Sequence, residues 1–320
     1  MKHAAARQSG AALLLAMVIV VLVATVAAGM VWQQTRAISV EAAERARAQA
    51  AWVLAGAMDW ARLILREDQR SGQQRSNAYD GLDEPWAQPL AEARLSAFLA
   101  ADKDNNADSG PEAFISGAIE DAQSRFNLRG LLDDGGKVLV PQLEGFRRLS
   151  ALVGASSDAA DRIAQALQGV VAAPSADAQG GPPLRPTRLA DLAWLGIDKP
   201  TLERLAPFVD LLPVATPVNA NTAPREVLVA ALDIDAGTAQ RLVQARGREA
   251  FKTMAAVAAQ LPQGVQMDPA RVAVGSSYFR VSGRLRLDER LLEERSLLVR
   301  RDNRVDVLQR ERQSFSALPR

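Results

Sequence analysis

The sequence predicts an α+β fold in which one long N-terminal helix precedes an all-helical block and a C-terminal antiparallel sheet. Three observations support this order. Residues 11–32 form an apolar run that continues into an amphipathic segment, residues 131–274 repeat apolar side chains at helical spacing, and residues 275–314 change to a period of two. We therefore expect a helix, a helical domain and a sheet to follow one another along the chain.

The apolar run from Ala11 to Trp32 is long enough to cross a membrane. As a helix its 22 residues span about 33 Å, against a hydrocarbon core of about 30 Å. A cleaved secretion signal is the alternative, but its apolar region is usually only about 7 to 15 residues long. Because Lys2, His3 and Arg7 precede the run without an acid, we expect the N-terminus in the cytoplasm and the bulk of the chain in the periplasm.

Residues 33–68 contain no proline and should continue the helix beyond the inner membrane. The apolar residues recur at three-and-four spacing, which predicts a stripe packed on a folded domain. This stripe consists of Ala46, Ala50, Val53, Ala57, Trp60 and Ile64. The helix should end near Glu67, because residues 69–85 are rich in Ser, Gly and Asn.

Composition excludes several kinds of chemistry. The chain has no cysteine, and His3 is its only histidine, so disulfides, thiolate nucleophiles and imidazole-based catalysis or zinc binding are excluded from the rest of the chain. With 38 basic and 37 acidic residues, the charge balance indicates no polyanionic partner. The absences of cysteine and of further histidine remove most hydrolase mechanisms.

The C-terminal part alternates apolar and basic residues. Phe279, Val281, Leu285 and Leu287 stand at every second position, with Gly283 between them, which is typical of a half-buried strand. Turn residues at 288–289 and 302–303 divide this part into three antiparallel strands.

The N-terminal segment resembles the type IV prepilin and pseudopilin signal. A basic leader ends in Gly10, and the apolar helix begins directly at Ala11. The resemblance implies that prepilin peptidase cleaves between these two residues and that Ala11 becomes N-methylated. Most members carry glutamate at the fifth mature position, where this chain has Leu15. A buried carboxylate is costly unless it is paired, so the absence of this glutamate suits a subunit that has no other subunit above it in the filament. In this absence the chain resembles the K subunit of type II secretion.

A second segment supports the same resemblance. The family pattern I-x-D-x-x-x-x-F-N-L is matched by Ile119, Asp121, Phe126, Asn127 and Leu128. The resemblance implies a pilin-like α+β domain from 69–130 and 275–314, one long helix on an antiparallel sheet, with an all-helical domain inserted at 131–274.

The resemblance also implies a function and partners. The function is that of a non-enzymatic minor pseudopilin, which caps the tip of the pseudopilus and initiates its assembly for export of folded proteins across the outer membrane. The implied partners are minor pseudopilins of the I and J types, the major pseudopilin, prepilin peptidase and the inner-membrane assembly platform. A minor type IV pilin is one alternative.

A membrane-anchored DNA-uptake protein is the other alternative, because residues 217–261 resemble a helix-hairpin-helix module. DNA-binding versions place Gly-apolar-Gly in the hairpin, where bare amides receive a phosphate. Here the hairpin reads Asp233-Ile234-Asp235, whose carboxylates would repel a phosphate, so we do not expect nucleic acid as a partner. The residues expected to cap the first helix, with Pro224 in its first turn, are Asn219, Asn221 and Thr222.

One loop carries alternating oxygen ligands of the kind that Ca²⁺ prefers. These are Asp102, Asp104, Asn106 and Asp108, followed by Glu112. However, Ala107 and Ala113 stand where an EF-type loop has glycine and its closing glutamate. A solvated loop and a Ca²⁺ site remain the two interpretations, and no cofactor is required.

Overall fold

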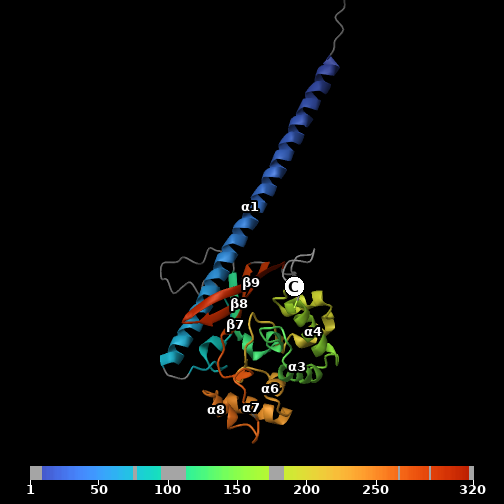
Figure 1. Cartoon of the computed structure of the whole chain (residues 1–320). Coiled ribbons are helices and arrows are strands. Elements are labelled where there is room, and N and C mark those ends of the chain that lie inside the picture. The colour runs from blue at the N-terminus through green and yellow to red at the C-terminus, as the bar shows by residue number, and fades with distance from the viewer. Residues whose placement is uncertain are drawn as a thin grey trace, which may run out of the picture. The chain divides into compact units, whose positions relative to one another are not determined.

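The computed structural model describes residues 9–74, 78–94, 113–172, 184–265, 267–287 and 290–316. The chain divides into two compact units, Met1–Ala55 and Gly56–Arg320. The described part of the first unit is helical throughout and belongs to α1 (Ser9–Gln74), which is drawn in blue in Figure 1. By length and composition α1 is sufficient to cross a membrane. It ends seven residues beyond the predicted end at Glu67, whose carbonyl accepts a hydrogen bond from Ser71 Oγ.

The second unit contains a five-stranded antiparallel sheet with the order β1-β2-β7-β8-β9. The strands are β1 (Leu90–Arg94), β2 (Ala113–Asp121), β7 (Tyr278–Leu287), β8 (Arg290–Arg301) and β9 (Arg304–Ser316). The last three form the predicted meander, confirming the period-two interpretation. The turn between β8 and β9 has positive φ at Asp302 (47°) and Asn303 (64°), as a tight hairpin with the right-handed sheet twist requires. The other predicted turn, at 288–289, lies outside the described residues.

Within the second unit, the last turns of α1 pack on this sheet. Met58, Ala61 and Leu65 are buried against Phe279 and other sheet residues. The predicted stripe is correct at Ala50, which is buried, but beyond it the buried positions are displaced by one residue, and Trp60, expected to be buried, is 47 % exposed. The reason is that α1 carries two apolar stripes about 100° apart, and the spacing alone cannot show which one faces the sheet.

A helical body lies between β2 and β7 in the sequence. Its helices are α3 (Val140–Leu152), α4 (Ala159–Ala172), α5 (Lys199–Leu205), α6 (Arg225–Leu232), α7 (Ala236–Arg248) and α8 (Met254–Ala258), with a 3₁₀ helix, η5, at Leu189–Leu195. They enclose a single large apolar cluster that includes Phe146, Ile163 and Leu242. A Cβ on Gly145 would lie 2.7 Å from Ala230 O, so α3 and α6 approach closely.

The expected all-helical insertion needs two corrections. It contains the short strands β4 (Val209–Asp210), β5 (Val218–Asn219) and β6 (Val272–Ala273). Strand β4 pairs in parallel with β3 (Phe126–Asn127), which precedes the insertion, and β5 pairs in parallel with β6. Strands of two residues are too short to show a period of two. The predicted helical spacing of 131–274 is also interrupted after α5, which ends at Leu205, because Pro207 has no N–H to continue a helix.

Candidate functional site: a buried polar junction

A group of buried polar side chains joins the helical body to the sheet. We call it the buried polar junction, and its members are Asp80, Asp121, Asn219, Asn221, Thr222, Ser276 and Arg300. They come from four segments: the loop after α1, the end of β2, the segment before α6, and the region around β7 and β8.

Asp121, at the end of β2, is the centre of the junction. Its carboxylate accepts hydrogen bonds from Asn219 Nδ2 at 2.8 Å, Thr222 Oγ1 at 2.6 Å and Ser276 Oγ at 2.7 Å. The backbone N–H of Gln123 donates to its other oxygen at 2.8 Å. Burial raises the pKa of Asp121, and these hydrogen bonds oppose the rise. One carboxylate therefore holds together segments about 100 and 155 residues away in sequence.

The expected capping role of the Asn-x-Asn-Thr segment is wrong. Helix α6 begins at Arg225 with Pro224 as its N-cap, and no side chain in the described ranges caps it. Asn219 also donates to Asp80 O, at 3.0 Å. Asn221 exchanges two hydrogen bonds with the backbone of Phe251, Nδ2 to O at 2.9 Å and N–H to Oδ1 at 2.8 Å. The local sequence resembles a cap, but these side chains satisfy distant buried groups instead.

The structure explains why Asp121 and Asn127 stand at this spacing within residues 119–128. Phe126 stacks on Phe146 at 5.6 Å, and Leu128 is fully buried. Asn127 accepts from the N–H of Leu212 at 3.1 Å and donates to Val214 O at 2.7 Å. Strand β2 ends at Asp121, and both polar side chains cap short 3₁₀ turns, η3 (Ala122–Ser124) and η4 (Leu128–Leu131).

Arg300 of β8 connects the junction to α1. Its guanidinium donates to both oxygens of Asp80, at 2.5 and 2.7 Å, and to Asp68 Oδ2 at 2.8 Å. It also lies over the ring of Phe279, 4.8 Å from the ring centroid. The backbone N–H of Ser276 donates to Asp80 at 2.7 Å. This buried ion pair was not predicted, because its partners stand 220 residues apart and no local spacing relates them.

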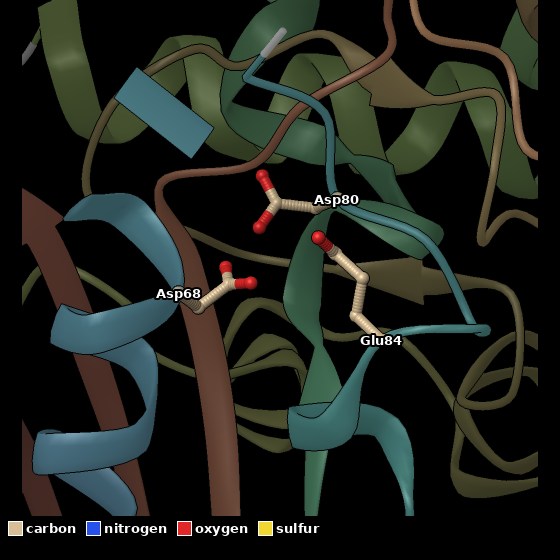
Figure 2. Close-up of side chains that lie close together, drawn as sticks. All are labelled: Asp68, Asp80 and Glu84. Carbon is tan, nitrogen blue, oxygen red and sulfur yellow. The ribbon is translucent and has the colours of Figure 1, made fainter. Parts of the chain in front are cut away.

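Glu84 completes an acidic group beside the junction. Figure 2 shows Asp68, Asp80 and Glu84 converging, and one carboxylate oxygen of each lies within 4.8 Å of the others. Glu84 accepts from the N–H of Gly81 and from Trp86 Nε1, each at 2.9 Å. Burial raises the pKa of Glu84 to about 7 and that of Asp80 to about 6. The three carboxylates could hold a metal ion by distance, but Arg300 already supplies a cation to two of them.

The hairpin acids have structural roles. Asp235 is the N-cap of α7 and accepts from the N–H of Thr238 at 3.0 Å. Asp233 adopts the left-handed conformation with φ 57° and forms an ion pair with Arg148 at 3.2 Å. Both carboxylates therefore bind groups of this chain, and that of Asp235 stands at the N-terminus of α7, where a phosphate would otherwise be received.

The remaining predicted sites have different positions. Gly10 and Ala11 lie in the first turn of α1, and Leu15 is exposed on it. The candidate Ca²⁺ ligands, Asp102, Asp104, Asn106, Asp108 and Glu112, lie outside the described residues.

A long apolar helix whose later turns pack on an antiparallel sheet defines a pilin-like subunit. Two family models described as "Type II secretion system (T2SS), protein K" match residues 218–275 and 124–214. Type II secretion system protein K of Pseudomonas aeruginosa is 32 % identical over 328 residues, covering 95 % of this chain and 92 % of the relative. That of Pectobacterium carotovorum subsp. carotovorum is 28 % identical over 335 residues, covering 95 % and 96 %. The chain belongs to the type II secretion system protein K family, whose members are non-enzymatic pseudopilins.

A solved structure has the same fold. A chain in the crystal structure of the GspK-GspI-GspJ complex from the enterotoxigenic Escherichia coli type 2 secretion system superposes with a TM-score of 0.64. The match covers 85 % of this chain and 98 % of that chain, at 20 % identity. The fold class predicted from the sequence is thus confirmed.

Proposed function

We propose that this chain caps the tip of the pseudopilus and initiates its assembly, for export of folded proteins across the outer membrane. The observation that carries this proposal is the helical body, which is inserted between the adjacent strands β2 and β7 and tied to the sheet by the buried polar junction. A large body fixed rigidly beside the sheet leaves little room for a further subunit to stack above it.

The proposed partners are minor pseudopilins of the I and J types. The structurally similar chain was solved in a GspK-GspI-GspJ complex, which supports this choice. The major pseudopilin, prepilin peptidase and the inner-membrane assembly platform complete the proposed set.

We also propose a topology and a processing step. Residues 1–10 form a leader that is removed, 11–32 cross the inner membrane, and the bulk of the chain lies in the periplasm. Residues 69–130 and 275–314 form the pilin-like domain around the insertion at 131–274. The continuous helix from Ser9 supports retention of the apolar run after cleavage. Replacing Leu15 with glutamate should impair placement at the tip, measured as lost secretion and a less stable tip complex, and unchanged values would count against this role.

The test is intact mass and N-terminal peptide analysis of the membrane-extracted chain after mild cross-linking in its own cell. We expect a mature chain that begins at methylated Ala11, linked to two other short-leader membrane proteins. An uncut chain, or one that begins beyond Trp32 without such partners, would contradict the proposal.

The 102–112 loop remains a prediction of its own. Calorimetric titration of the extracted full chain with Ca²⁺ should give binding heat and a higher melting temperature if the loop is a site. The absence of both effects would leave the solvated-loop interpretation.

A further inference from the structure

We propose that a groove beside α1 binds a carboxylate-bearing segment of a neighbouring filament subunit. The inference rests on the proposed function, because it requires such a neighbour. The groove has a volume of about 410 Å³ and lies between the last turns of α1 and the start of β9. Arg62, Leu63 and Arg66 line it from α1, and Val305 lines it from β9.

The charges of the groove do not balance. Arg62 Nη1 pairs with Asp59 at 3.0 Å, and its Nε donates to Val305 O at 2.8 Å, so this arginine is already engaged. Arg304 and Asp306 contribute one charge of each sign. Arg66 is the remaining charge, and it has no ion-pair partner among the residues that the structure describes. The groove therefore carries one excess positive charge, which a negatively charged segment would neutralise.

The side chain of Arg66 also lacks an acceptor. Its Nε atom is buried and forms no hydrogen bond within the described part of the chain. A buried donor left unsatisfied is costly, particularly on a charged group. A carboxylate in the groove would satisfy it if the half-buried Arg66 side chain turns toward the groove, because guanidinium and carboxylate groups form two parallel N–H···O bonds.

Apolar side chains beside Arg66 indicate which residue type should stand next to the carboxylate in the bound segment. Leu63 is 48 % exposed and lines the same groove as Val305, which is buried in the cluster between α1 and the sheet. An aspartate or glutamate followed closely by an apolar residue would place its charge on Arg66 and its apolar neighbour on Leu63. We therefore expect an acidic-apolar segment of a neighbouring subunit, rather than a uniformly acidic one.

The experiment measures capture of minor pseudopilins by the full chain, co-expressed with them and extracted in mild detergent. Arg66→Glu should lower capture at least about tenfold, as expected when one partner of a close charge pair is reversed. Lys199→Glu is the matched control, since it makes the same charge change on the exposed surface of α5. Arg66→Lys keeps the charge but not the bidentate geometry, and should lower capture several-fold without lowering the melting temperature.

A photo-cross-linking phenylalanine analogue at position 63 identifies the occupant. We expect a cross-link to a subunit peptide that contains an acidic residue within a few positions of the linked site. If both Arg66 variants capture as much pseudopilin as Lys199→Glu does, the binding role of the groove is overturned and the tip-complex function is left intact. A cross-link to lipid alone would also overturn the binding role of the groove. If the wild-type chain captures no minor pseudopilin, both proposals fail.

Discussion

The sheet of the second unit has two contacts of opposite character. Helix α1 meets it mainly through an apolar cluster, in which Met58, Ala61 and Leu65 pack on residues such as Phe279, with the ion pair of Asp68 and Arg300 at its edge. The helical body is tied to it through the buried polar junction, in which Asp121 accepts four hydrogen bonds. Apolar packing tolerates substitutions of similar volume, whereas a buried polar network depends on every partner. We infer that the α1 contact holds the helix and that the junction fixes the orientation of the helical body.

The largest expected effect is loss of the buried cation. Arg300→Met leaves Asp80 and Asp68 without their guanidinium and should lower the free energy of unfolding by about 3–5 kcal/mol. Arg301→Met is the matched control, because this neighbouring side chain is exposed and, among the residues that the structure describes, donates to Tyr278 Oη rather than to a carboxylate. Denaturant melts of both variants measure the difference. Equal losses of unfolding free energy in the two variants would show that the buried Arg300 ion pairs do not stabilise the junction.

An apolar truncation should have a smaller effect. Leu65→Ala removes a fully buried side chain from the α1 contact and should cost about 3 kcal/mol. The same change at the half-exposed Leu63 should cost less than about 1 kcal/mol. If Leu63→Ala proved the more harmful in the same melts, the observed face of α1 would be incorrect.

The acidic group should make stability depend on pH. Burial raises the pKa of Glu84 from 4.5 to about 7, so between these values the folded chain holds a proton that the unfolded chain has released. The contribution of Glu84 to the free energy of unfolding is therefore greatest below about pH 4.5. It is lost as the pH rises to about 7, and it changes little above that pH. Asp80 acts in the same direction, between 3.8 and about 6.

Melting temperatures between pH 5 and 7.5 test this dependence. We expect a decrease for the wild-type chain that Glu84→Gln reduces, because a neutral amide has no proton to release. Glu203→Gln, at an exposed position of α5, should leave the decrease unchanged. A wild-type profile that is flat over this range would refute the role of Glu84.

The smallest expected effect is at Trp60. Because this side chain is 47 % exposed, Trp60→Ala should change the free energy of unfolding by only about 0.5 kcal/mol. The sequence-predicted stripe would instead bury Trp60 and make its truncation as harmful as that of Leu65. Comparing the two alanine variants in one denaturant series distinguishes the two orientations of α1.

Regular spacing predicted most of the fold. The meander of β7 to β9 and most helices of the body follow from repeated apolar positions, because each repeat is local. The junction follows no such repeat. Asp121 and Asn127 belong to the family pattern found in the sequence, but besides capping local 3₁₀ turns they bind groups 85 or more residues away. Only the folded chain brings these residues and their partners together. The sequence therefore indicated that Asp121 and Asn127 matter, but it did not indicate which residues they contact.

The insertion between β2 and β7 has a consequence for the order of folding. These strands pair directly, with Asp121 opposite Phe279, although residues 122–277 separate them. Closing an unstructured loop of this length costs about 4–5 kcal/mol in chain entropy. If the helical body folds first, it already holds its two ends together. We therefore expect amides of α3 and α6 to gain protection before those of β2 and β7 in pulsed hydrogen exchange, with the centre of the sheet closing late.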